Sequence, residues 1–170
     1  MLKSIINRML HSIAFIIPFG DSVRPFLHRL RGVKIGKNVW ISKFVYIDDN
    51  HPECVEIGDN STIGLRTTIF THTYFGKRQK HNPNKVVIGK NVYVGPHCLI
   101  LPNVTIGDNS VIKGGTVVTR NVPPNTLYGM PNAEPLATVT VPLTYEHGYE
   151  EFVKGLRPIR KKNNNQKDKN

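Results

Sequence analysis

Aliphatic residues recur at every sixth position over much of this chain of 170 residues. Steps of six from Ile35 to Val118, interrupted by one insertion of four residues and by one longer insertion, meet only isoleucine or valine. The twelve positions are Ile35, Ile41, Ile47, Ile57, Ile63, Ile69, Ile88, Val94, Ile100, Ile106, Ile112 and Val118. A period of six fits neither a helix nor a single strand. It indicates a short strand followed by a tight turn, repeated many times.

Three such units of six close one triangular coil of about eighteen residues. Stacked coils then place Ile35, Ile57, Ile88 and Ile106 in one inward column, and the small residue four positions after each aliphatic fills a corner. We interpret the runs Gly-Lys-Asn and Gly-Asp-Asn as turns that tolerate a positive φ. The sequence therefore predicts an all-β parallel β-helix of about four to five coils over residues 33–135, with an insertion loop at 75–85.

The segments outside the repeat have other patterns. Apolar residues at helical spacing predict an N-terminal amphipathic helical segment over 1–32, in which Pro18 and Gly20 end the first helix. Asp21 or Ser22 can cap a second short helix that runs through Leu30. After the repeat, we expect a strand and a short helix over 136–156 and a disordered basic tail over 157–170.

The basic residues gather at the two ends. Lys and Arg exceed Asp and Glu by 23 − 12 = 11, of which residues 1–34 contribute five and residues 154–170 contribute six. Because the repeat itself is neutral, we expect no nucleic-acid partner. Residues 1–20 and the tail fit peripheral contact with an anionic membrane, or a helix that packs on its own domain or on a neighbouring subunit. Two cysteines and the lack of a clear signal peptide predict a cytoplasmic protein, in contact with the inner face of the membrane in the first case.

Several stretches resemble the hexapeptide-repeat acyltransferase family, in its sugar O-acetyltransferase branch. They are GVKIGKNVWIS (32–42), YIDDNHPECVEIGDNSTIG (46–64), the long run 86–126 and GMP (129–131). The resemblance implies a left-handed β-helix, a homotrimer, and acetyl-CoA bound in a groove between neighbouring subunits. It also implies transfer to a sugar of capsule, exopolysaccharide or lipopolysaccharide, without a metal.

Acyl transfer to a hydroxyl needs a base, and an imidazole suits that task near neutral pH. The family's catalytic histidine lies at the end of the coil before a protruding loop, here IFTHTYFGKRQKHNPNK (69–85). His72 matches relatives that have threonine-histidine-aspartate at this point. Other relatives place the histidine two residues later, where this chain has Tyr74, and His81 in the loop would then be the base.

Acceptor and donor contacts follow from the same resemblance. In related enzymes an aspartate of a pair such as Asp48-Asp49 contacts the acceptor, although such a carboxylate also suits orienting an imidazole, and the pair can be a turn without a ligand. Tyr74 and His81 complete the expected acceptor contacts. The expected donor contacts, for pantetheine, phosphates and adenine, are Tyr93, Pro96, Gly114, Gly115, Thr119, Arg120 and Pro131. Cys98, at a small inward position, is expected in the core.

Three other functions compete with sugar O-acetylation. An N-acetyltransferase of an amino sugar would use the same base and donor. A scaffold would keep the coil without the chemistry. A carbonic anhydrase on this fold needs three histidines with a close pair about five residues apart, whereas His72, His81 and His97 lie nine and sixteen residues apart, which excludes it.

Overall fold

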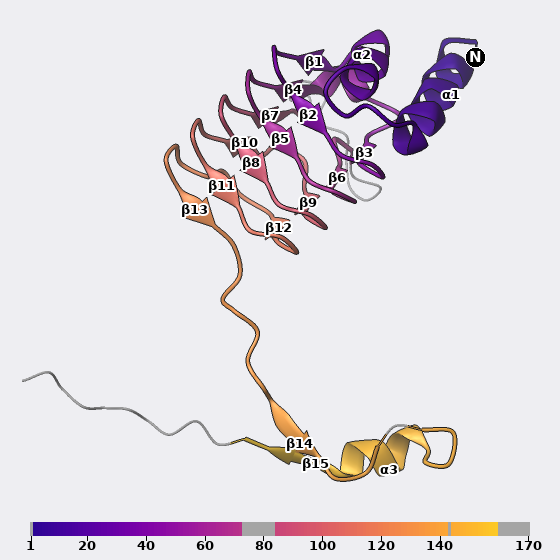
Figure 1. The fold of residues 1–170 in the computed structure, drawn as a ribbon, viewed down its shortest axis with the longest axis vertical. Helices are drawn as coiled ribbons and strands as arrows, with labels where there is room; N and C mark the ends of the chain where they lie inside the picture. Colours follow the sequence, from indigo (N-terminus) through magenta and orange to yellow (C-terminus); the bar gives the residue numbers. More distant parts are fainter. Residues whose placement is uncertain (1, 73–83, 143, 160–170) are drawn as a thin grey trace, which may run out of the picture. The chain divides into compact units, whose positions relative to one another are not determined.

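The computed structural model describes residues 2–72, 84–142 and 144–159, and the chain forms two compact units, 1–130 and 131–170. The first unit is a stack of triangular coils, and each coil adds one strand to each of three parallel sheets (Figure 1). The first sheet has the order β1 (Lys34–Ile35), β4 (Val55–Ile57), β7 (Val86–Ile88) and β10 (Thr105–Ile106). The second has the order β13 (Leu127–Tyr128), β11 (Val111–Ile112), β8 (Tyr93–Val94), β5 (Thr62–Ile63) and β2 (Trp40–Ile41). The third has the order β12 (Val117–Val118), β9 (Leu99–Ile100), β6 (Thr68–Ile69) and β3 (Tyr46–Ile47).

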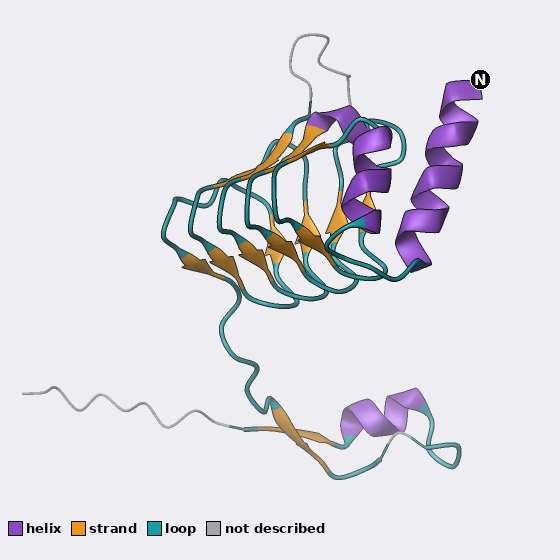
Figure 2. Ribbon diagram, turned by 45° about the horizontal axis from the view of Figure 1, so that its top comes forward, coloured by secondary structure: helices purple, strands orange, loops and turns teal. Residues whose placement is uncertain are grey.

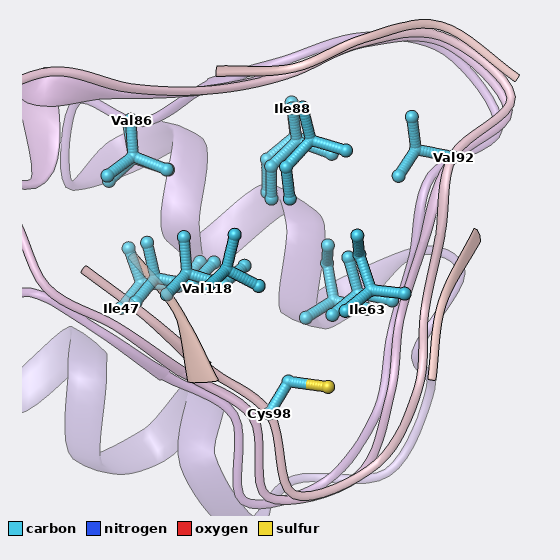
Figure 3. Close-up of a cluster of buried hydrophobic side chains, with 14 of the residues drawn as sticks. Ile47, Ile63, Val86, Ile88, Val92, Cys98 and Val118 are labelled. Atoms are coloured by element: carbon cyan, nitrogen blue, oxygen red, sulfur yellow. The ribbon is translucent and has the colours of Figure 1, made fainter. Parts of the chain in front are cut away.

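The six-residue repeat places the core as predicted. Ile35, Ile57, Ile88 and Ile106 pair in register along the first sheet. The aliphatic residues of all three sheets point into the coil, where they form one buried cluster (Figure 3). Cys98 is 2% exposed and its sulfur turns inward at a corner, so its predicted place in the core is confirmed. The parallel β-helix over the repeat is likewise confirmed, with four complete coils and the start of a fifth among the described residues.

Asparagine and glycine have different structural roles in the turns. In the Gly-Lys-Asn and Gly-Asp-Asn runs it is the asparagine that has the positive φ, 53° at Asn38 and 57° at Asn60. The amides of successive asparagines also bond to one another along this corner, as from Asn60 to Asn91 at 3.2 Å. Most glycines are instead required for space: a Cβ on Gly64 would lie 2.5 Å from the carbonyl carbon of Gly95. Stacked backbones approach too closely there for any side chain.

Two helices cover the open end of the first coil, as Figure 2 shows. They are α1 (Leu2–Ile16) and α2 (Val23–Leu30), and both agree with the helices predicted from the sequence. α2 contacts β1 and β2, and α1 contacts α2 and β3. Neither these helices nor any other helix among the described residues is long and apolar enough to cross a bilayer.

The second unit contains an antiparallel pair of strands and one short helix. β14 (Ala137–Val139) pairs with β15 (Leu156–Pro158), and α3 (Tyr149–Lys154) lies between them in sequence. The prediction of a disordered tail from residue 157 is wrong for Arg157 and Pro158, because both belong to a strand. Residues 160–170 of the predicted tail lie outside the described residues. The 3₁₀ turn Pro52–Cys54, in the first unit, lies in the four-residue insertion.

Candidate active site

His72 and Asp48 meet at the corner that leads from the third sheet back to the first, which we call the third corner. Asp48 follows β3 and His72 lies three residues after the end of β6, the neighbouring strand of the same sheet. The imidazole Nδ1 is 2.5 Å from a carboxylate oxygen of Asp48. The His72 side chain is 12% exposed, whereas that of Asp48 is fully buried. The stacking of two coils thus forms a carboxylate–imidazole pair in which only a small part of the imidazole is exposed.

The Asp48 carboxylate is held on both of its oxygens. One accepts the backbone N–H groups of Asn50 and His51 at 2.9 and 3.2 Å, and the other accepts the backbone N–H of Thr71 at 2.9 Å. Burial alone would raise the pKa of Asp48, but these hydrogen bonds and the one from His72 outweigh it and lower the pKa below its usual value. An ionised carboxylate only accepts, so Nδ1 of His72 carries the shared proton and a neutral ring leaves Nε2 as the basic nitrogen.

The expected acceptor residues have different surroundings. The buried Asp48 carboxylate is used by His72 and the backbone, which is the imidazole-orienting arrangement that the sequence left open. Asp49 is half-buried and accepts a hydrogen bond of 2.9 Å from the Tyr46 hydroxyl. It also lies 3.7 Å from Arg8 of α1. Tyr74 and His81 lie outside the described residues.

The expected donor residues fall on two different corners. Pro96, Gly114 and Gly115 lie at the second corner, which joins the second sheet to the third. Thr119 and Arg120 lie at the third corner and are exposed, as His72 is in part. Gly115 has φ 73°, and a Cβ added to it would meet no heavy atom within 4 Å, so a ligand can approach its backbone closely. Tyr93 points outward from β8 with 48% exposure, and Pro131 is the first residue of the second unit.

The segment RLRGVKIG (29–36), which leads into the first coil, contains a residue that no sequence pattern singled out. Arg31 of this segment is 6% exposed, and its guanidinium donates a hydrogen bond to the main-chain carbonyl of Asp48. It also lies 2.8 Å from Nδ1 of His28 and 3.1 Å from Nδ1 of His11. Since the guanidinium only donates, both imidazoles accept and are neutral. Desolvation and then the Arg31 charge lower the pKa of His28 to about 3 and that of His11 to about 4.

This buried cluster predicts loss of stability in mild acid. His28 has a pKa of about 3 in the folded chain and about 6.5 when unfolded, so the unfolded chain binds more protons between these values. The free energy of unfolding therefore falls as the pH drops below about 6.5, by about 2 kcal/mol at pH 5 from His28 alone. Urea unfolding of His28→Asn, which keeps an acceptor for Arg31 and does not titrate, should depend less on pH. The half-buried His147, replaced in His147→Asn, lies in the second unit away from this cluster in sequence and is the control. An equal pH dependence in all three proteins would contradict the assignment.

Comparisons with known proteins identify the family of this chain. The family model "Bacterial transferase hexapeptide (six repeats)" matches residues 85–120. The Bacillus subtilis protein named "Putative acetyltransferase YvoF" is 36% identical over 130 residues, which cover 75% of this chain and 73% of that protein. The galactoside O-acetyltransferase of Escherichia coli is 38% identical over 98 residues, 55% of this chain and 47% of that enzyme.

Solved structures show the same architecture. A galactoside acetyltransferase in complex with coenzyme A has a TM-score of 0.51 and 28% identity, and the match covers 73% of this chain and 74% of that one. A hexapeptide-repeat acetyltransferase of Vibrio cholerae has a TM-score of 0.56 at 24% identity over 72% of this chain and 79% of that one, which supports the fold. The β-helix is therefore left-handed, as in these neighbours. The chain belongs to the hexapeptide-repeat family of acetyltransferases.

Proposed function

We propose that this chain is an acetyl-CoA-dependent O-acetyltransferase that acts on a sugar hydroxyl in capsule, exopolysaccharide or lipopolysaccharide biosynthesis. The observation that carries the proposal is the Asp48–His72 pair on an acetyltransferase fold. The similarity to a galactoside O-acetyltransferase supports a sugar acceptor, and that to its coenzyme A complex supports the donor. We place the chain in the cytoplasm, where acetyl-CoA is made.

His72 acts as the general base. Its Nε2 takes the proton of the acceptor hydroxyl while the hydroxyl oxygen attacks the thioester carbon. The same imidazolium then returns the proton to the sulfur as the carbon–sulfur bond breaks, so the products are the acetyl ester and free CoA. Asp48 holds the ring in the required tautomer and stabilises the imidazolium. Donor and acceptor meet in one ternary complex, so no acetylated residue is needed.

The two-corner arrangement supports a site shared between copies of the chain. His72 and Arg120 lie at the third corner, whereas Gly115 lies at the second, and the third sheet separates these corners within one chain. A groove bordered by all of them forms when the second corner of one copy faces the third corner of another. We therefore propose a homotrimer in which Gly114, Gly115 and Tyr93 of one copy contact the donor beside His72 of its neighbour.

Thiol release from acetyl-CoA tests the proposed function. The acceptor panel contains free sugars, nucleotide-linked sugars, lipid-linked sugars and the corresponding amino sugars. Release that depends on a hydroxyl sugar supports O-acetylation, and release only with amino sugars shows N-acetylation instead. A protein that neither releases thiol nor gains melting temperature with CoA is a scaffold, since a ligand of the native state must stabilise it.

Helix α1 has an exposed apolar stripe that supports peripheral membrane contact. Its members are Ile5, Ile6, Met9, Ile13 and Ile16, each between 45% and 63% exposed. The opposite side of the helix packs on the first unit through Ala14, which is 1% exposed. Arg8 flanks the stripe, and segments 1–34 and 154–170 together carry a charge of 5 + 6 = +11. An anionic bilayer matches both the stripe and the charge.

Substitution of one residue in this stripe should release the protein from vesicles. Met9→Glu removes an exposed apolar side chain and adds a negative charge, so the vesicle partition coefficient should fall at least about tenfold. Ser4→Glu makes the same change of charge off the stripe and is the control. Co-sedimentation with phosphatidylserine-containing vesicles measures both. Equal binding of wild type and Met9→Glu would contradict membrane contact through this stripe and favour a stripe covered by another subunit.

A further inference from the structure

Arg31 connects the two N-terminal helices to the strand end that carries Asp48. The residue follows α2, and its side chain is buried among α1, α2 and the end of β3. One terminal nitrogen donates to the carbonyl oxygens of Ile47 and Asp48, at 2.8 Å each. No carboxylate lies within ion-pair distance of this guanidinium in the part of the chain that is described. Its partners are therefore main-chain carbonyls and neutral side chains.

Asn7 of α1 binds the same turn together with Arg31, and we call these two side chains the clamp. The side-chain oxygen of Asn7 accepts a hydrogen bond of 2.7 Å from Nε of Arg31, and its amide nitrogen donates to the carbonyl of Asp49. The carbonyls of residues 47, 48 and 49 are thus all bound by two side chains from the helical segment. The carboxylate of Asp48 points the other way, to Thr71 and His72. The main chain of Asp48 is held from one side and its side chain from the other.

We propose that Arg31 is a positioning residue for acetyl transfer, which fixes the main chain of Asp48 so that its carboxylate meets His72 in a single geometry. This inference rests on the proposed role of His72 as base. Without the Arg31 guanidinium, the carbonyls of Ile47 and Asp48 lose a buried donor and the turn at 48–50 can rearrange. A displacement of about 1 Å in a catalytic group costs up to about 10² in rate. The helices would then be part of the catalytic framework as well as a cover for the first coil.

We expect the Arg31 charge to act on the pair as well. Desolvation lowers the pKa of Arg31 to about 10, against the opposing effects of Asp49, Tyr46 and Asp48, so the guanidinium stays charged at neutral pH. A fixed cation beside the Asp48–His72 pair disfavours binding of a further proton by the pair. The groups that face this cation, from α1, α2, β3 and the turn after it, are Asn7, His11, His28, Tyr46, Asp48 and Asp49. Loss of the charge should therefore move the acid limb of the pH–rate profile to higher pH.

Arg24 of α2, the helix that Arg31 follows, offers a matched control. It is 4% exposed and, like Arg31, donates to main-chain carbonyls, those of Ile17 and Ile41. Ile41 lies in β2 of the second sheet, away from the strand end that carries Asp48. Both arginines contribute to stability, but only Arg31 contacts Asp48.

The test compares Arg31→Gln, Arg31→Lys and Arg24→Gln by pH-dependent thiol release. Arg31→Gln should lower kcat at least about tenfold, keep KM for acetyl-CoA within about twofold and shift the acid limb upward. Arg31→Lys keeps the positive charge but loses the planar guanidinium with its several donors. Its kcat should therefore fall while the acid limb of the pH–rate profile stays in place. For Arg24→Gln, the kcat per folded molecule and the position of the acid limb should both match those of wild type. Arg31 variants with wild-type kcat and profile would overturn the inference, and if Arg31→Gln does not fold, Arg31→Lys decides it.

Proton NMR separates this inference from the proposed function, because it needs no acceptor. The proton between Nδ1 of His72 and Asp48 should give a low-field signal that His72→Ala abolishes. Arg31→Gln or Arg31→Lys should weaken or shift that signal, whereas Arg24→Gln should leave it unchanged. An unchanged signal in the Arg31 variants would overturn the positioning role. Full turnover by His72→Ala would instead refute the proposed base, whatever the NMR result.

Discussion

His72→Ala should lower the kcat of acetyl transfer by about 10²–10⁴-fold, because the variant has no base to take the acceptor proton. The KM for acetyl-CoA should change little, since the expected donor contacts lie on other residues. The fold should persist, because the aliphatic columns that hold the coils together do not include residue 72. Acceptor-dependent thiol release, with and without the substitution, measures the effect.

His147→Ala is the matched control, because His147 is half-buried in the second unit and contacts Thr144. It should retain wild-type kcat. Retained turnover in His72→Ala would contradict the assignment of the base, and the same assay on His81→Ala and Tyr74→Phe would then locate it. Loss of turnover in His81→Ala alone would assign the base to the loop, as in the alternative considered from the sequence.

The repeat made most of the fold predictable, because in a solenoid each position is fixed by its neighbours one coil away. Ile47 stacks on Ile69 once the four-residue insertion is allowed for, and the structure has that pairing. Any two residues that closely follow these strands must therefore lie close together. The spacing alone therefore predicts that Asp48 and His72 lie close together. The burial of Asp48, in contrast, depends on how the turn at 48–51 folds back.

The contribution of Arg31 could not be read from periodicity. Arg31 lies outside the repeat, and its contacts with Ile47 and Asp48 arise because α2 covers the end of the stack. A helical pattern shows which face of a helix is apolar but not where that helix docks. The sequence signal was an arginine directly before the first coil in the motif RLRGVKIG. A buried arginine needs several acceptors, and only the folded chain shows which carbonyls supply them.

Gly64→Ala should be strongly destabilising even though it adds a single methyl group. The new Cβ would lie 2.5 to 2.6 Å from the carbonyl carbon of Gly95, the nitrogen of Pro96 and the carbonyl oxygen of Val94, all of them backbone atoms. No side chain can rotate away, so the second and third coils must separate at this corner, where Gly64 donates to Val94 at 2.8 Å. We expect a loss of about 3 kcal/mol and a fall in melting temperature of about 10 °C.

Gly115→Ala separates this steric effect from the loss of glycine itself. A Cβ on Gly115 meets no heavy atom within 4 Å, so the cost is confined to its φ of 73°, about 1 kcal/mol. The melting temperature of Gly64→Ala should therefore lie well below that of Gly115→Ala, and equal effects would contradict the close stacking of the coils.

The Asp48–His72 pair joins the first coil to the second, whereas Gly64 joins the second to the third. The fraction of Gly64→Ala that stays folded should therefore keep wild-type kcat, because in a stacked repeat an interface loosened on one side of a coil leaves the interface on its other side in place.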